Sequence, residues 1–247
     1  MNSPTMHKPS SLHPSYEHRY PRALEFRVTN SDRAVKHMHW LRNRFGQHVA
    51  VWRYDPVVFT SLTNMDFHRE NFARLAGALE GATNEVVISF AQVYRKTERN
   101  MNWAAHRFGF TWEDPIDVVK ADLAGEFGGI AAQHGMKAGM CSQRRFAVDG
   151  VGEASCINSH RLSLVAGKPI QAEHRGNRSE CECDVSRDIG AYDTCPHGCV
   201  YCYAVQNRGR AVQLYRRHNP ESEFLIEPDP GIVAQDPANS QLRILLD

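Results

Sequence analysis

Between residues 24 and 141 the sequence alternates between strand and helix patterns, and this alternation restricts the possible folds more than any other feature. Short runs that are apolar, or that alternate with polar residues, indicate strands. Longer segments with apolar residues every three or four positions indicate helices. Strands that alternate with helices favour a parallel sheet with crossover helices. The predicted strands cover 24–29, 49–54, 86–91 and 136–141, and the predicted helices start at Ser31, Asp66 and Asp114.

Glycine and proline mark the expected ends of several elements. Gly46 and Gly135 are expected to close two of the helices, because glycine tolerates the backbone conformation that follows a helix. Pro56 is expected to stop the second strand, because proline has no backbone N–H to donate. A closed (β/α) barrel needs eight strands, and only four are found. The predicted fold class is α/β, a partial or incomplete (β/α) barrel with parallel strands and a Cys-rich C-terminal loop region, or else an open α/β sheet.

The composition changes on either side of this pattern, which suggests three regions. Residues 1–22 are rich in Pro, Ser and His without periodicity and predict a disordered arm. Residues 23–204 are predicted to form the barrel-like domain, with a Cys-rich, metal-binding region at 141–204 and one short helix within 157–167. Residues 205–247 are predicted to hold a basic helix and a Pro-rich tail.

The cysteine count and the N-terminal sequence together suggest a cellular compartment. Seven is an odd number, so the cysteines cannot all pair within one chain. The N-terminal residues lack the apolar core of a secretory signal, and no apolar run approaches the length of a membrane span. We therefore expect a cytoplasmic protein with no membrane contact, in a reducing compartment where structural disulfides are rare.

Three of the cysteines are concentrated in the segment DTCPHGCVYCYA. Cys195, Cys199 and Cys202 lie within eight residues, and Tyr201 directly precedes the last of them. Thiolates at such short spacing are typical of iron–sulfur clusters, whereas zinc sites usually take two matching pairs. The spacing therefore favours an iron–sulfur cluster over zinc. A zinc-binding module associated with nucleic acid is the alternative.

The same residues resemble the signature of the radical S-adenosylmethionine (SAM) enzymes. In that superfamily three cysteines hold a [4Fe–4S] cluster, and its open iron chelates the amino and carboxylate groups of SAM. One electron then cleaves the sulfonium to give a 5′-deoxyadenosyl radical, which acts on a substrate that the motif does not specify. The resemblance implies a [4Fe–4S] cluster at the three cysteines, SAM as a cofactor and Tyr201 among the residues that bind it. It also implies an electron donor such as a flavodoxin or a ferredoxin.

Two features separate the chain from that superfamily. The cysteine motif follows every predicted strand, whereas in radical SAM enzymes it usually follows the first. Gly128 and Gly129 lie inside a predicted helix, and no Gly-Gly-Glu segment follows a strand. A catalytically inert, shortened relative that retains a structural cluster is therefore a further alternative.

A narrower resemblance extends over several separated motifs. WRYDP, FHRENFARLAGALEGAT, VVISF, CIN and SRDIGAYDTCPHGCVYCYA occur in the order typical of domain-of-unknown-function family 1848, and the likeness covers roughly residues 47–204. Members of this bacterial family usually carry an additional N-terminal portion of the barrel. The resemblance therefore implies a barrel-related fold and an N-terminally shortened chain.

Polar side chains follow two of the predicted strands. Arg53 and Asp55 stand at the end of the second strand, and Lys96 lies just past the third. Functional groups of parallel α/β folds gather at the carboxyl ends of the strands. Arg53 and Asp55 are therefore candidates for binding the charged ends of SAM or of a substrate, and all three residues are catalytic candidates. The alternative for Arg53 and Asp55 is an ion pair that fixes the Asp-Pro turn.

The four remaining cysteines form a second candidate set. Four is the usual number of protein ligands for a complete cluster or a structural zinc ion. We predict that this set holds a second [4Fe–4S] cluster or a zinc ion. The alternative is that two of them are buried as apolar residues, a common fate of free thiols. The set consists of Cys141, Cys156, Cys181 and Cys183.

The basic segment RGRAVQLYRRH could bind nucleic acid through its four arginines and Tyr215. A solvated face of a basic helix is the more common origin of such a run. The net charge of +1 also argues against a globally basic nucleic-acid binder. Nucleic-acid binding is therefore the less favoured interpretation.

Overall fold

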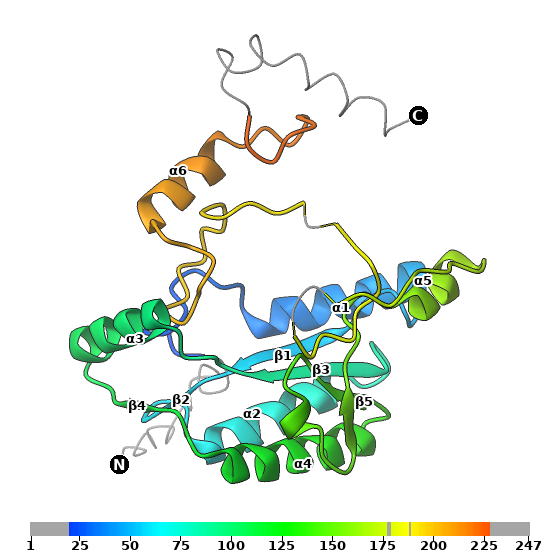
Figure 1. The fold of residues 1–247 in the computed structure, drawn as a ribbon, viewed down its shortest axis with the longest axis horizontal. Coiled ribbons are helices and arrows are strands. Elements are labelled where there is room, and N and C mark those ends of the chain that lie inside the picture. The colour runs from blue at the N-terminus through cyan, green and yellow to red at the C-terminus, as the bar shows by residue number, and fades with distance from the viewer. Residues whose placement is uncertain (1–19, 177–178, 188, 228–247) are drawn as a thin grey trace, which may run out of the picture.

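The computed structural model describes residues 20–176, 179–187 and 189–227, and a sheet of four parallel strands lies at its centre (Figure 1). The strands lie in the order β1-β3-β5-β6, so each of the four pairs with the next one along the chain. The α/β class and the parallel sheet predicted from the sequence are confirmed. The strand bounds are β1 Trp52–Val57, β3 Glu85–Phe90, β5 Lys137–Met140 and β6 Val151–Glu153.

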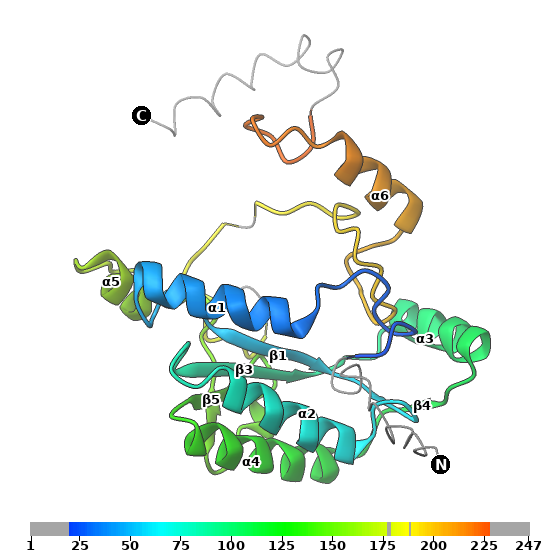
Figure 2. The same ribbon diagram turned by 180° about the vertical axis from the view of Figure 1, so that it is seen from behind.

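Helices cover one face of this sheet. α2 (Met65–Ala78) lies between β1 and β3 in the chain, and α4 (Asp117–Gln133) lies between β3 and β5. The two helices pack side by side beneath the strands in Figures 1 and 2. α1 (Ser31–Phe45) precedes β1 and packs Val35 and Met38 against the same core.

Shorter elements complete the described structure. Strands β2 (Phe59–Thr60) and β4 (Trp112–Glu113) pair antiparallel, and α3 (Arg95–Phe108) lies between β3 and β4 in the chain. Within the described ranges, no helix combines the length and the apolar character that crossing a bilayer requires. The remaining helical segments are the 3-10 turn η1 (Arg144–Phe146), α5 (Ser159–Ala166) and α6 (Arg208–Arg217).

The alternation of side chains along β1 separates the core from the candidate site. Successive side chains of a strand point to opposite faces of the sheet. Tyr54 is buried on the helical side, where it contacts the rings of Phe72 and Phe127. These two rings, from α2 and α4, stack with their centroids 4.2 Å apart. Arg53 and Asp55 therefore lie on the opposite face, away from α2 and α4.

Two strand predictions are wrong. Residues 24–29 form no strand; the segment is irregular and contacts the cysteine loop described below. β1 does not stop at Pro56 but runs through it to Val57, after a cis Asp55–Pro56 peptide bond. Proline is tolerated here because β1 is an edge strand, and its pairing with β3 is irregular between Tyr54 and Val57.

The three predicted helices are confirmed, with observed starts at Ser31, Met65 and Asp117. The short helix predicted within residues 157–167 is α5, and the predicted basic helix is α6. The sequence patterns do not predict α3 or β6. The Pro-rich tail from residue 228 onward lies outside the described residues.

Candidate functional site

A cavity of about 280 Å³ lies at the carboxyl ends of β1, β3 and β5, on the sheet face opposite α2 and α4. Parallel α/β sheets place functional groups at this edge. Strand-end residues and two cysteines of the signature share the cavity. Its lining includes Arg53, Asp55, Ser89, Cys141, Cys199, Tyr201, Cys202 and Tyr203.

A larger hollow of about 740 Å³ lies near the amino ends of the strands. Its lining includes Glu85 and Lys137, which begin β3 and β5, and Arg161 of α5. None of the seven cysteines contributes to it. We therefore place the candidate site at the smaller cavity.

Arg53 and Asp55 form an ion pair at the smaller cavity. Arg53 donates to Oδ2 of Asp55 through Nη2 and through Nε, the second bond measuring 3.0 Å. The hydroxyl of Ser89 donates to Oδ1 of the same carboxylate. Burial lowers the pKa of Arg53, but Asp55 and a bond to Cys156 outweigh this effect and raise the pKa, so the guanidinium stays charged. Because 41% of the Arg53 side chain is exposed, the pair is accessible to a ligand.

Cys141 and Cys156 meet beside Arg53. Cys141 follows β5 and Cys156 follows β6, and the pairing of these strands brings the two Sγ atoms to 3.6 Å. Nη1 of Arg53 donates to Sγ of Cys156 at 2.7 Å, and Nη2 lies 3.8 Å from Sγ of Cys141. The hydrogen bond from Cys156, assisted by Arg53, lowers the pKa of Cys141 to about 5 despite burial. The pKa of Cys156 is raised, because it donates that bond and is partly buried.

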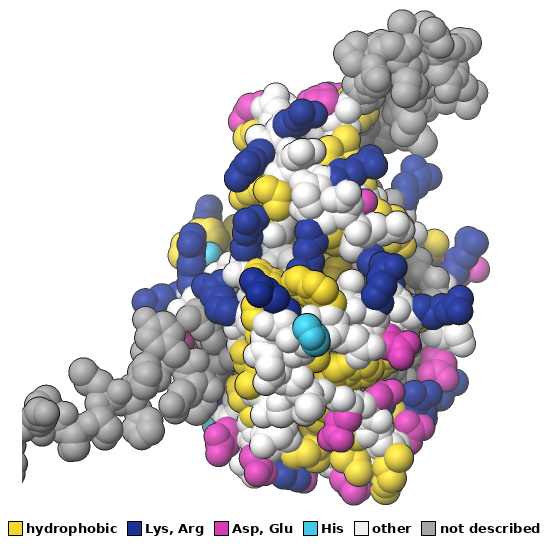
Figure 3. Space-filling model, turned by 90° about the vertical axis from the view of Figure 1, so that its left-hand side faces the viewer, with side chains coloured by type: hydrophobic (Ala, Val, Ile, Leu, Met, Phe, Trp, Pro, Cys, Tyr) yellow, Lys and Arg dark blue, Asp and Glu magenta, His cyan; other side chains and the backbone are white. Residues whose placement is uncertain are grey.

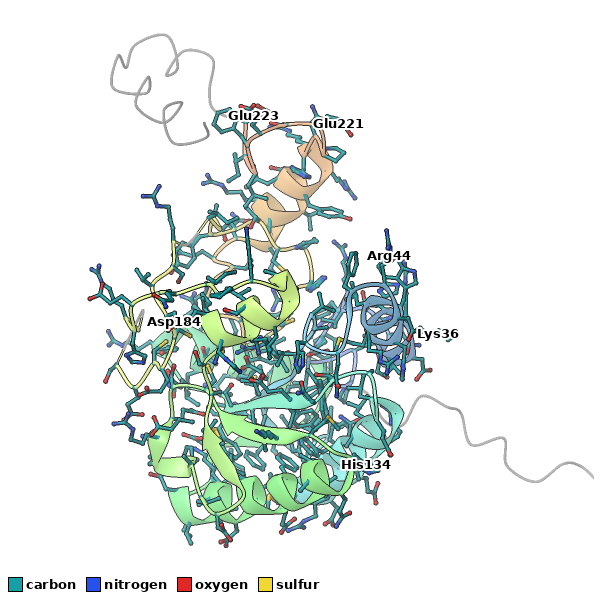
Figure 4. The ribbon with its side chains drawn as sticks, turned by 90° about the vertical axis from the view of Figure 1, so that its right-hand side faces the viewer. Lys36, Arg44, His134, Asp184, Glu221 and Glu223 are labelled. Carbon is teal, nitrogen blue, oxygen red and sulfur yellow. The ribbon has the colours of Figure 1, made fainter. Side chains whose placement is uncertain are left out.

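A third cysteine approaches this pair from the loop after α5. The backbone N–H of Ile157, next to Cys156, donates to Sγ of Cys183 at 3.4 Å. Asp184 fixes the loop at this point, because its Oδ2 accepts the N–H of Ser159 at the start of α5 at 2.5 Å (Figure 4). The loop is therefore attached to the segment that carries Cys156.

The predicted second metal set is thus partly brought together. Burial raises the pKa of Cys183, and the neighbouring Cys181 thiol adds to the increase. None of the seven cysteines forms a disulfide in the described structure. Within the described residues, no three His, Cys, Asp or Glu side chains form a group that could hold a metal ion. A metal bound by Cys141, Cys156, Cys181 and Cys183 stays a prediction.

The signature cysteines lie on an irregular loop that residues 20–27 hold in place. We call residues 20–27 the N-terminal clamp. The N–H of Val200 donates to the carbonyl of Leu24 at 3.0 Å, and the N–H of Arg27 donates to the carbonyl of His197 at 3.0 Å. The side chains of Leu24 and Val200 are fully buried in one apolar cluster. The alternating apolar residues that predicted a strand at 24–29 therefore pack against a loop.

Tyr201 of the signature is bound by the side chains of the clamp. Its hydroxyl donates to Glu25, and its ring lies against that of Tyr20, with the centroids 6.3 Å apart. Tyr20 donates to the carbonyl of Pro56 at 2.8 Å and accepts the N–H of Val58 at 3.1 Å. Burial and the Glu25 carboxylate raise the pKa of Tyr201, so its hydroxyl keeps its proton. Tyr20 belongs to the predicted disordered arm, yet it is part of the fold.

The signature thiols suit a metal cluster chemically. Cys195 is exposed, whereas Cys199 and Cys202 are half-buried. Burial raises the pKa of Cys199 to about 11, and Glu25, Cys202 and Cys195 add to the increase. The surroundings of Cys199 therefore disfavour its anionic form, and a bound cation would reverse this effect. Thiolates are the donors that iron–sulfur clusters and zinc ions take, but the three thiols do not converge on one point in this structure, and a metal bound by them stays a prediction.

The sequence profile of domain-of-unknown-function family 1848 (DUF1848) matches residues 16–204. The chain belongs to the DUF1848 family. No curated protein and no solved structure matches it. The matched range includes both the N-terminal clamp and the whole signature. The DUF1848 domain thus begins well before residue 47, where the resemblance in separate motifs begins.

Lys96 of the DUF1848 domain contacts the signature loop through the backbone. Its Nζ donates to the carbonyl of Tyr203 at 3.1 Å, directly after Cys202. Lys96 does not line the cavity. The observed contact gives Lys96 a role in holding the loop to α3, and its catalytic role stays a prediction.

Basic side chains gather on one side of the molecule. Figure 3 shows Lys and Arg over the region of α3 and α6, whereas Asp and Glu lie mostly toward the other end of this face. The guanidinium of Arg208, in α6, lies 5.3 Å from the ring centroid of Phe26 and 5.7 Å from that of Trp103. These contacts attach α6 to the clamp and to α3. Nucleic-acid binding by α6 stays a prediction.

Three residues that shape the DUF1848 site escape the sequence analysis: Tyr20, Glu25 and Gln143. Oε1 of Gln143 accepts the N–H of Phe90 at 2.8 Å, and its Nε2 donates to the carbonyl of Phe90 at 3.1 Å, which closes the end of β3. Only Glu25 has a sequence signal. It lies between the apolar residues Leu24 and Phe26, as a polar residue of a half-buried segment does.

Proposed function

We propose that this DUF1848 chain is an iron–sulfur protein that resembles the radical SAM enzymes. Cys195, Cys199 and Cys202 hold a [4Fe–4S] cluster, and the cavity of about 280 Å³ beside them binds SAM or another small charged molecule. One observation carries the proposal: Cys199 and Cys202 line the same cavity as the Arg53–Asp55 pair. Cysteines late in the chain thus share a cavity with charged groups at the strand ends.

The charges at the cavity suit a ligand with an amino and a carboxylate group. The Asp55 carboxylate accepts hydrogen bonds from an ammonium group, and the exposed part of the Arg53 guanidinium donates to a carboxylate. Tyr201, fixed by Glu25, presents its ring to the same cavity. When bound, the cluster supplies one electron to the sulfonium of SAM.

The exposure of Cys195 supports electron delivery from a partner protein. A cluster with one ligand at the surface is accessible to a small redox protein. We include a flavodoxin or a ferredoxin as the electron donor in the proposal. Seven cysteines without a disulfide suit a reducing compartment such as the cytoplasm.

The sheet supports a partial (β/α) barrel as the fold behind this function. The four parallel strands pair in chain order, as successive strands of a barrel do. α2 and α4 occupy the outer face, and the charged residues of β1 occupy the inner face. In a barrel of this kind the cavity lies at the mouth.

Anaerobic purification with metal analysis and spectroscopy tests the proposal. We expect a brown protein with about four irons per cluster and a matching amount of sulfide. Addition of SAM is expected to change the electron paramagnetic resonance (EPR) spectrum of the reduced cluster. Reduction with dithionite is expected to release 5′-deoxyadenosine. The triple variant Cys195→Ala, Cys199→Ala, Cys202→Ala is expected to lose this iron and both responses.

Three other outcomes of these experiments would each contradict one part of the proposal. A colourless protein with zinc identifies a zinc-binding module. An iron-loaded protein that shows no spectral response to SAM and no nucleoside product identifies an inert relative with a structural cluster. A triple variant that retains all its iron contradicts the ligand assignment.

A further inference from the structure

The pair formed by Cys141 and Cys156 is a reactive group separate from the signature. Their Sγ atoms lie 3.6 Å apart, and a disulfide requires about 2.05 Å. Both sulfurs lie on short segments that follow adjacent parallel strands, so a small shift of either segment closes the gap. Neither cysteine belongs to the proposed [4Fe–4S] ligands.

We propose that Cys141 and Cys156 form a redox-active dithiol that reduces peroxides, with Cys141 as the attacking thiolate and Cys156 as the resolving thiol. The substrate class is hydrogen peroxide or a small alkyl hydroperoxide.

The position of Cys141 at the cavity makes it the nucleophile of the pair. The thiolate is the reactive form of cysteine, and a nearby cation stabilises it. Cys141 lines the cavity, whereas Cys156 does not, and Sγ of Cys141 lies 3.8 Å from Nη2 of Arg53.

A small oxidant has access to this sulfur. Cys141 is only 7% exposed, but it lines the cavity of about 280 Å³ that opens at the strand ends. The cavity also presents Ser89, whose hydroxyl already bonds Asp55. A molecule the size of a peroxide fits beside the thiolate without rearrangement of the sheet.

The reaction balances in two steps. The Cys141 thiolate attacks one oxygen of the peroxide, an S–O bond forms, the O–O bond breaks, and the leaving oxygen departs as water or an alcohol after taking up a proton. The sulfur is oxidised to a sulfenic acid, and the peroxide is reduced by two electrons. Cys156 then attacks the sulfur of Cys141, the S–S bond forms, and hydroxide leaves with the Cys156 proton as water. Two equivalents of a small-molecule thiol restore the dithiol by exchange.

Oxidation would alter the neighbouring charge pair. In the reduced form Arg53 contacts both sulfurs and Asp55. A disulfide carries no negative charge, so Arg53 then retains Asp55 as its anionic partner. The redox state of the dithiol thus changes the field at the cavity without a change in the fold.

Peptide mapping of the full chain tests the proposal directly. Trypsin releases Cys141 in residues 138–144 and Cys156 in residues 146–161, each with a single cysteine. We treat the reduced, anaerobically purified protein with one equivalent of hydrogen peroxide and alkylate the remaining thiols. Mass spectrometry is expected to find the two peptides linked in most chains, and added thiol is expected to separate them. The same result is expected in the triple Ala variant of the signature, so failure of the cluster proposal leaves this test intact.

Three variants assign the roles. Cys156→Ser is expected to leave a sulfenic acid at Cys141 that dimedone captures, because the resolving thiol is gone. Arg53→Gln is expected to slow the reaction with peroxide about tenfold, because the thiolate loses its cation. Cys181→Ser is the matched control, and its linked peptide is expected to form as in the parent chain.

Two results overturn the proposal. One is the absence of the linked peptide in the parent chain, which needs no variant to fold. The other is the release of zinc or iron from the triple Ala variant during the peroxide treatment, in proportion to the oxidation of Cys141 and Cys156. In that case the pair belongs to the second metal set, together with Cys181 and Cys183.

Discussion

The hydroxyl of Tyr201 donates a hydrogen bond to the carboxylate of Glu25, 176 positions earlier in the chain. The bond joins the signature loop to the N-terminal clamp beside the cavity. Burial raises the pKa of both groups, and the bond to Tyr201 partly offsets the increase for Glu25. A buried polar group that loses its partner destabilises a fold by about 1–3 kcal/mol. The pair therefore couples the stability of the clamp to the placement of the signature.

The first prediction concerns this pair. Glu25→Ala is expected to lower the free energy of unfolding by about 1–3 kcal/mol, because the Tyr201 hydroxyl loses this acceptor in a buried place. Tyr201→Phe is expected to have an effect of the same sign. Urea denaturation of the single and double variants measures the coupling, and the double variant is expected to lose less than the sum of the two. If the loss in the double variant equals the sum of the two single losses, the bond contributes nothing to the free energy of unfolding.

The second prediction uses two adjacent glycines of α4. A Cβ on Gly128 would lie 2.8 Å from the carbonyl oxygen of Gly150 and from Cγ2 of Val151, whereas a Cβ on Gly129 meets no atom within 4 Å. Gly128→Ala has to push α4 away from β6 and is expected to cost about 1–3 kcal/mol. Gly129→Ala is the matched control and is expected to stabilise the helix by up to about 1 kcal/mol. Thermal unfolding compares the two, and equal effects contradict the close approach of α4 to β6.

The third prediction concerns the pH dependence of stability at His68. His68 is fully buried, with Nδ1 3.0 Å from the Tyr54 hydroxyl and Nε2 3.1 Å from the Val58 carbonyl. Burial lowers the pKa of His68 to about 4, from 6.5, while the bond to Val58 partly offsets this effect. Between these two values the unfolded chain binds a proton that the folded chain excludes. The free energy of unfolding is therefore expected to fall by about 3 kcal/mol as the pH falls from about 6.5 to 4.

Urea denaturation at pH 7 and pH 5 measures this effect. Other groups also titrate in this range, so the comparison is made with His68→Gln, which keeps hydrogen-bonding atoms but has no proton to gain. The difference between the two chains is expected to shrink at the lower pH. A difference that is constant with pH would mean that His68 does not titrate below its ordinary range.

The fourth prediction rests on the proposed function. Asp55→Asn is expected to weaken binding of SAM about tenfold, or about 1.4 kcal/mol, because an ammonium group loses its charged acceptor. Titration of the reduced cluster with SAM, followed by EPR, gives the affinity. Asp66→Asn is the control, because Asp66 pairs with Arg69 at 3.0 Å and does not line the cavity. A loss of similar size in both variants would indicate a general effect of charge.

The sequence predicts the sheet because its strands and helices have strong apolar patterns. β3 buries three residues on the core side, and α4 carries a broad apolar face. α3 is missed because its buried residues form one narrow row, Thr97, Met101 and Ala104, in an otherwise polar segment. β6 is missed because it buries only Val151. Patterns identify an element only when it buries enough apolar surface to dominate its segment.

The sequence predicts the features of the site that involve residues close together in the chain. It does not predict the contacts between residues that are far apart in the chain. The spacing of Cys195, Cys199 and Cys202 is visible in one short segment, as is the proximity of Arg53 to Asp55. The meeting of Arg53 with Cys141 and Cys156 depends on the pairing of four strands, β1, β3, β5 and β6, which no local pattern specifies. The bond between Tyr201 and Glu25 depends on a loop and an irregular segment. Neither has the periodic apolar pattern that identifies a helix or a strand.

The separation of Glu25 from Tyr201 also has a consequence for biosynthesis. Ribosomes add about 5–20 residues per second, so roughly 10–35 s separate the appearance of the two residues. All four strands of the central sheet are made in that interval, because they lie between residues 52 and 153. Cys141 and Cys156 are thus synthesised before Cys195. The clamp can therefore close on the signature only after every strand of the sheet has been synthesised, and the same holds for the delivery of any cofactor to the signature.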